Sequence, residues 1–195
     1  MILSLSNKVT CFFVTHGIIK SEDKEVYSYS FQILFATVLN LLALCVLSII
    51  TGTVIETLLY LFAFVSLRQA AGGYHAKNHF RCFLLFMTAY AAFLSLIKFF
   101  PSQYIAIATL ICVPLTLFLV FIFSPIDDPN KPFSENEIIK LKRKSRIVVV
   151  CLAMLAILVF ILFSNKIWGF SILLGILSVA LSLLASAVKK GGLVQ

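Results

Sequence analysis

The chain has 195 residues, of which 61% are hydrophobic and only 12% are charged, and its net charge is +8. This composition excludes a soluble globular domain, because several apolar runs approach or exceed the roughly 18 residues that cross a bilayer. Five cysteines show no paired spacing, so no disulfide framework is indicated. The sequence predicts an all-α, polytopic membrane protein in which residues 1–195 form a single integral membrane domain.

Residues 1–20 precede the first apolar span. Apolar side chains recur here at helical spacing, while polar side chains fall on the opposite face. The apolar positions are Ile2, Leu5, Val9, Phe12 and Phe13, and the polar ones are Ser6, Asn7, Lys8 and Thr10. This pattern predicts an amphipathic helix that lies in the membrane interface.

About six transmembrane helices follow. Their apolar runs cover residues 31–50, 54–71, 82–100, 104–123, 147–163 and 168–188. Pro114 lies inside the fourth run, where we expect it to kink the helix. Residues 125–146 form the longest polar stretch, which we interpret as a loop with a basic end.

The basic residues predict the orientation of these spans. Alternation of six spans leaves only Lys98 and Lys166 on one side of the membrane. The other side holds Lys8, Lys20, Lys24, Arg68, Lys77, Arg81, Lys131, Lys140, Lys142, Arg143, Lys144, Arg146, Lys189 and Lys190. By the positive-inside rule, both termini, residues 68–82 and the basic loop are cytoplasmic. The positive charge predicts attraction to anionic lipids, and no motif indicates binding to nucleic acid.

The cytoplasmic segment 68–82, with the sequence RQAAGGYHAKNHFRC, concentrates chemically reactive side chains. Cys82 opens the third span, so its thiol lies at the positive end of a helix dipole. Arg81 beside it favours the nucleophilic thiolate further. His75 and His79 are both candidate bases for this thiol, and the segment therefore contains the parts of a Cys/His catalytic pair.

The spacing of the two histidines leaves two readings open. On a continuous helix, His79 would contact Cys82, while His75 would lie about 10 Å away along the axis. His75 can act as the base only if the chain bends, and Gly72-Gly73 allows a non-helical backbone. Alternatively, His75, His79 and Cys82 would share one face of a straight helix and bind zinc.

Gly72-Gly73-Tyr74-His75-Ala76, with Cys82 at the head of a membrane helix, resembles the accessory gene regulator protein B family. Members of that family are bacterial membrane cysteine endopeptidases that process quorum-sensing peptide precursors. The resemblance implies that His75 and Cys82 are catalytic and that His79 is not. It also implies a thiolactone or lactone product, a homodimer, and a precursor with an amphipathic N-terminal helix and an acidic C-terminal tail.

Other residues near the motif have candidate roles in binding or orienting a substrate. Gln69 or Asn78 could orient the imidazole, and backbone amides near Gly72 and Gly73 could stabilise an oxyanion. Arg68, which precedes them, is a further candidate for binding or orienting the substrate. The acidic tail could dock on the basic residues Lys140, Lys142, Arg143 and Lys144. The sequence indicates no cofactor and favours no bound metal. A small transporter or a membrane scaffold remains an alternative, although a scaffold leaves the His/Cys cluster unexplained and a transporter usually carries ionisable residues at mid-membrane.

Overall fold

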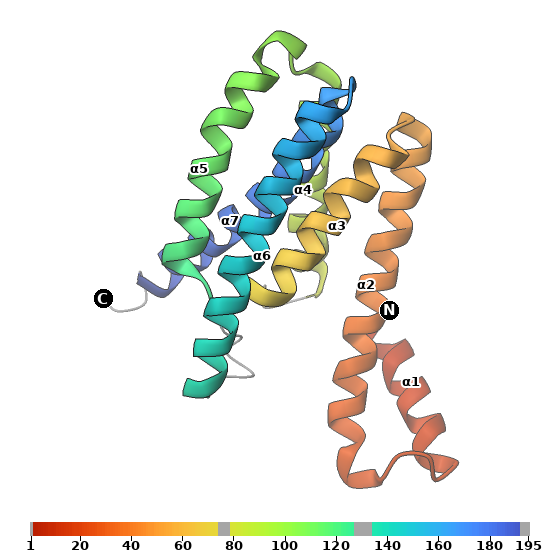
Figure 1. Ribbon diagram of the computed structural model, residues 1–195. Coiled ribbons are helices and arrows are strands. Elements are labelled where there is room, and N and C mark those ends of the chain that lie inside the picture. The colour runs from red at the N-terminus through yellow and green to blue at the C-terminus, as the bar shows by residue number, and fades with distance from the viewer. Residues whose placement is uncertain (1, 74–78, 127–133, 192–195) are drawn as a thin grey trace. The chain divides into compact units, whose positions relative to one another are not determined.

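The computed structural model describes residues 2–73, 79–126 and 134–191, and nearly all of them are helical (Figure 1). The helices are α1 (Ile2–Thr15), α2 (Lys24–Thr51), α3 (Val54–Ala71), α4 (His79–Phe99), α5 (Ile105–Phe123), α6 (Glu135–Leu162) and α7 (Lys166–Gly191). Short 3-10 turns at Ser21–Asp23 and Ser102–Tyr104 precede α2 and α5.

Within the described ranges, six helices are long and apolar enough to cross a membrane, and α1 is the short helix before them. Large apolar side chains on these helices point outward, as Ile50 (74% exposed) and Leu110 (75% exposed) illustrate. Such a surface suits lipid rather than water. The prediction of an all-α, multi-pass membrane protein is therefore confirmed.

The basic run before the fifth span differs from its sequence interpretation. Ser134 caps α6 through a capping box: its amide donates to the Glu137 carboxylate at 2.9 Å, and its hydroxyl accepts from the Glu137 amide at 3.4 Å. Because this cap starts the helix at Glu135, residues 135–146 are helical and continuous with the span. The expectation of a loop through residue 146 is wrong for this part.

The helices divide into two compact units, and α4 contributes to both. The first unit comprises Met1–Thr51 and Ala76–Thr88. Here α1 lies alongside α2, with the rings of Phe13 and Phe31 stacked 5.7 Å apart. Leu5 and Phe12 are exposed, as an interfacial helix requires, whereas Thr10 is fully buried and its hydroxyl donates to the helix's own backbone.

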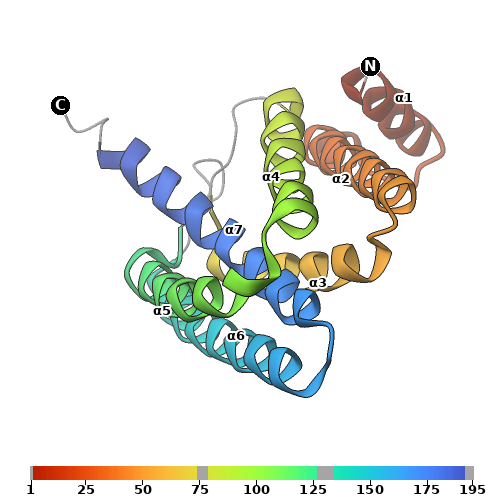
Figure 2. The same ribbon diagram turned by 90° about the horizontal axis from the view of Figure 1, so that it is seen from above.

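The second unit comprises Gly52–His75 and Ala89–Gln195, and α7 is its central helix. Helices α3, α5 and α6 all pack against α7, as Figure 2 shows. Glycines permit the close approach: an added Cβ at Gly175 would lie 2.6 Å from the Tyr60 carbonyl oxygen, and one at Gly169 would lie 2.6 Å from that of Ala156. Small residues at membrane helix contacts allow backbones to pack tightly.

Side-chain contacts give the directions of these helices. From one end of α3 to the other, Glu56 accepts from Trp168 (3.3 Å), Tyr60 donates to Ser178 (3.1 Å) and Arg68 donates to Ser182 (2.9 Å). Along these three hydrogen bonds the residue numbers increase on both α3 and α7, so the two helices run parallel. That direction agrees with the predicted alternation, in which these are the second and sixth spans.

Candidate functional site

Two glycines end α3 and open the segment that the sequence singles out. The amide of Gly72 donates to the Arg68 carbonyl at 3.0 Å, which closes the last helical turn. Gly72 then takes φ +73° and Gly73 takes φ +139°. Both values lie in a region that glycine adopts at little steric cost. The chain therefore leaves helical geometry directly after Ala71, as the two glycines predict.

The segment after α5 is fastened to this end of α3. The amide of Ile126 donates to the Ala71 carbonyl at 3.1 Å, and Gly72 and Ile126 form an isolated parallel β-bridge. A Cβ added to Gly72 would collide with the Ile126 carbonyl oxygen. Gly72 is thus required for both its backbone conformation and the close approach of a second chain segment.

Gly73 is buried against a pair of polar side chains. Arg68, half-buried in the last turn of α3, donates from Nη1 to the Ser182 hydroxyl of α7 at 2.9 Å. A Cβ at Gly73 would collide with Arg68 Nη1 and lie 2.6 Å from Ser182 Oγ. Arg68, a candidate substrate-binding residue in the sequence, is therefore engaged within the protein. Gln69 is exposed.

The start of α6 lies at the same end of the second unit. Ser124, which follows α5, donates to Ser145 of α6 at 2.7 Å, and both side chains are buried. Arg146 donates to the Phe121 carbonyl at 3.1 Å, and its guanidinium lies 5.0 Å above the Phe121 ring. Because Ser124 is two residues from Ile126, these contacts bring the basic part of α6 to the end of α3 that carries Gly72 and Gly73.

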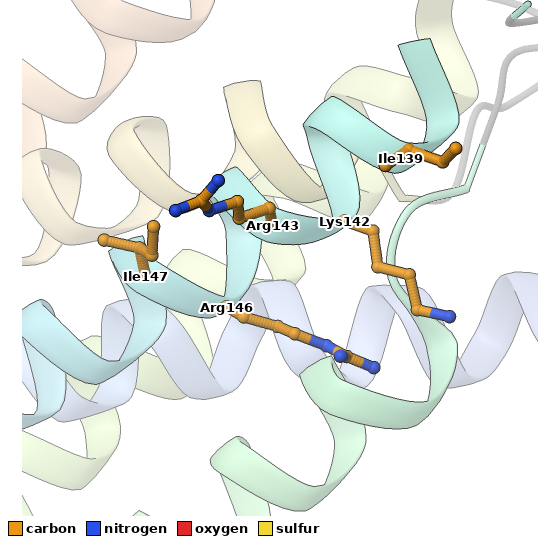
Figure 3. Close-up of a pocket in the computed structure, with 5 residues that line it drawn as sticks. All are labelled: Ile139, Lys142, Arg143, Arg146 and Ile147. Atoms are coloured by element: carbon orange, nitrogen blue, oxygen red, sulfur yellow. The ribbon is translucent and has the colours of Figure 1, made fainter. Parts of the chain in front are cut away.

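The first turns of α6 form a basic surface with an open pocket of about 530 Å³. Figure 3 shows its five lining residues, all on α6: Ile139, Lys142, Arg143, Arg146 and Ile147. Lys142 and Arg143 are exposed, as are the predicted docking residues Lys140 and Lys144. The surface combines exposed cations with two isoleucines.

The predicted nucleophile lies in the first turn of α4. This helix begins at His79, so Cys82 is three residues inside it, and its thiol is free and exposed. Exposure does not distinguish it, because Cys11, Cys45 and Cys151 are exposed too. Its position does: a helix N-terminus carries partial positive charge, and Arg81 precedes it.

Several residues that the sequence predicts to act in the same site as Cys82 fall outside the described part of the chain. His75, Lys77 and Asn78 lie in the gap between residues 73 and 79, and the side chain of His79 is likewise not described. The pairing of His75 with Cys82 therefore stays a prediction. Among described residues, no group of three His, Cys, Asp or Glu could hold a metal ion, and the His75–His79–Cys82 set lies only partly within them.

The sequence reasoning missed Ser182 and Ile126. A signal for Ser182 was present: Ser178, Ser182 and Ser186 recur every four residues in a mostly apolar span, which places them on one helix face. Polar residues at such spacing in a membrane helix indicate a contact with another helix. For Ile126, nothing in the sequence indicates that its backbone pairs with Ala71.

Comparison with known proteins identifies the family. The model of the family "Accessory gene regulator B" matches residues 6–183. The chain is 26% identical over 155 residues to putative AgrB-like protein 2 of Clostridium perfringens strain 13, covering 76% of this chain and 72% of the relative. It is 28% identical over 127 residues to protein FsrB of Enterococcus faecalis, covering 65% of this chain and 52% of the relative.

A second Clostridium perfringens relative, the putative AgrB-like protein of strain SM101, is 27% identical over 168 residues, covering 80% of this chain and 78% of the relative. No solved structure matches the chain significantly. The family match spans the end of α3, Cys82 and the basic surface of α6. The chain therefore belongs to the accessory gene regulator B family, multi-pass membrane proteins involved in accessory gene regulation and quorum-sensing peptide processing.

Proposed function

We propose that this protein is a membrane-embedded cysteine endopeptidase that removes the C-terminal tail of a quorum-sensing peptide precursor. One observation carries the proposal: an exposed thiol, Cys82, occupies the first turn of α4 seven residues after His75. The resemblance of Gly72-Gly73-Tyr74-His75-Ala76 and Cys82 to the motif of that family implies that His75 and Cys82 form the catalytic pair. Both residues lie in the segment that the charge distribution assigns to the cytoplasm.

In the proposed reaction, Cys82 Sγ attacks a backbone carbonyl carbon of the precursor. His75 takes the thiol proton as the new C–S bond forms, and it then protonates the amine as the C–N bond breaks. The products of this step are a thioester between Cys82 and the precursor, and the released tail. Backbone amides near Gly72 and Gly73, and those at the start of α4, are the proposed oxyanion donors.

Ring closure follows from the same thioester. A Cys or Ser of the precursor attacks the acyl carbon while His75 takes its proton, the C–S bond to Cys82 breaks, and the Cys82 sulfur leaves and takes that proton back from His75, so that a thiolactone or lactone forms. Exchange between two thioesters is nearly balanced in free energy, so water must be excluded if hydrolysis is not to compete. A reacting thiol at the membrane boundary supports such exclusion.

The substrate side of the proposal rests on the basic surface of α6. Its exposed residues Lys140, Lys142, Arg143 and Lys144 complement an acidic tail, and Ile139 and Ile147 add apolar area. We also propose a cytoplasmic location for this surface and both termini, contact with anionic lipids, and a homodimer, as the family resemblance implies. No metal or cofactor has a role in this reaction.

The test uses the full chain in liposomes with a synthetic precursor that carries an acidic C-terminal tail. Cleavage and ring closure are followed by mass spectrometry. Cys82→Ser and His75→Ala should each lose about 10²-fold or more in kcat, and the wild-type chain should yield a thioester adduct at Cys82. Cys151→Ser, which removes another exposed thiol, is the matched control. Cleavage by Cys82→Ser at the wild-type rate would overturn the proposal.

A further inference from the structure

We infer that Ser182 of α7 is a positioning residue for the proposed reaction. Together with Arg68 it forms a polar seat for Gly73, which precedes His75 by two residues in the sequence. The inference rests on the proposed function, since the role of His75 comes from there. Nothing in the sequence motif points to Ser182, which lies 100 residues after Cys82, in the last span.

The seat consists of two polar atoms that occupy the volume where a side chain at residue 73 would project. Arg68 Nη1 and Ser182 Oγ are 2.9 Å apart, and an ideal Cβ on Gly73 would meet both of them. Gly73 is itself buried at φ +139°. The backbone of Gly73 therefore rests directly on the Arg68–Ser182 hydrogen bond.

The hydroxyl of Ser182 has a fixed orientation. It donates to the Val179 carbonyl of its own helix at 2.8 Å, so its lone pairs are available to accept from Arg68. The helix that carries it is firmly packed, because the neighbouring Val179 and Leu183 are fully buried. A side chain on such an element can hold a partner in place, whereas one on an unpacked helix could not.

The consequence for catalysis follows from chain distance. His75 is only two residues after Gly73 in the sequence, so we expect a displacement of the Gly73 backbone to displace the imidazole. Misplacement of a catalytic group by about 1 Å can cost roughly 10²-fold in rate. Loss of the Ser182 hydroxyl should therefore lower the rate of the chemical step and leave precursor binding largely intact.

The test measures kcat and KM for precursor cleavage by the full chain in liposomes. Ser182→Ala should lower kcat by about tenfold or more, because a hydrogen bond to a charged group is lost, with KM changed less than about threefold. Ser182→Thr restores a hydroxyl and should recover most of the rate. Ser178→Ala is the matched control: it removes the bond to Tyr60 one turn earlier on α7 and should keep the wild-type kcat.

A double-mutant cycle completes the test. If Ser182 acts through Arg68, the variant Arg68→Gln/Ser182→Ala should be no slower than Arg68→Gln alone. A wild-type kcat in Ser182→Ala, or an equal loss of kcat in Ser178→Ala, would overturn the positioning role. The proposed function would still stand in that case if Cys82→Ser is inactive. An active Cys82→Ser would overturn the proposed function and this role with it.

Discussion

The backbone amide of Ile126 donates to the carbonyl of Ala71 at 3.1 Å, and this bond joins the segment after α5 to the end of α3. Ser124, two residues earlier, bonds to Ser145 of α6. One short stretch of backbone thus connects three helices at the place where the Gly72-Gly73 segment begins. The end of α3 is held by the fold before any substrate is present.

Replacement of Gly72 tests this connection. Gly72→Ala should destabilise the protein by more than about 2 kcal/mol, because positive φ costs a side chain roughly 1–2 kcal/mol and the Cβ also collides with the Ile126 carbonyl. Gly52→Ala is the control: Gly52 has φ +66°, but nothing lies within 4 Å of its added Cβ. Thermal unfolding in detergent should show the larger loss for Gly72→Ala, and equal losses would contradict the connection.

Much of the fold could be predicted from the sequence, because membrane spans follow from the length of apolar runs. The span of residues 54–71 coincides with α3, and the parallel contacts of α3 with α7 agree with alternating spans. The prediction from the sequence missed the start of α6. The basic run resembles a polar loop, although the Ser134–Glu137 capping box begins a helix there. A hydropathy profile scores each residue by its polarity and takes no account of helix capping, so it does not distinguish a charged first turn of a helix from a loop.

The site was less predictable than the fold. Gly72 and Gly73 indicated a non-helical turn, and both adopt positive φ. Their neighbours Ile126 and Ser182 come from distant segments. The periodicity of a single sequence does not predict which distant segments lie together. The basic surface was recognised by composition, but its helical form places Lys142, Arg143 and Arg146 around one pocket, which a loop would not specify.

The orientation of the spans gives a second prediction. Reporter fusions after Lys142 and at the C-terminus should report a cytoplasmic location, and a fusion after Asn165 should report the opposite side. The reason is the distribution of the sixteen basic residues, since the predicted arrangement leaves only Lys98 and Lys166 on the outer side. A cytoplasmic reporter after Asn165 would contradict the six-span arrangement.

The basic surface of α6 gives a third prediction. Lys142→Gln/Arg143→Gln should raise KM for an acidic-tailed precursor about three- to tenfold with little change in kcat, since exposed ion pairs contribute up to about 1 kcal/mol each. The difference from wild type should shrink at high salt. Lys8→Gln, which removes an exposed cation on α1, is the control. An unchanged KM would show that the basic residues serve topology and lipid contact only.

The last prediction separates the two histidines. Helix α4 begins at His79, so His79 and Cys82 are three residues apart on one continuous helix, the spacing at which side chains can touch. Geometry alone therefore favours His79, whereas the family pattern favours His75. A base at residue 75 requires the chain to leave helical geometry before α4, and Gly72 and Gly73 do so at positive φ.

We accordingly expect His79→Ala to keep substantial cleavage and His75→Ala to lose about 10²- to 10⁴-fold in kcat, as for a missing general base. The measurement is precursor cleavage in liposomes, with each variant's folding checked by thermal unfolding. A chelator added to the wild-type chain should leave the rate unchanged, because the proposed reaction uses no metal. If His79→Ala is inactive and His75→Ala active, then His79 is the base and the carried-over role of His75 is wrong. If a chelator abolishes cleavage and stoichiometric zinc restores it, His75, His79 and Cys82 are metal ligands instead, since zinc takes this combination of nitrogen and sulfur donors.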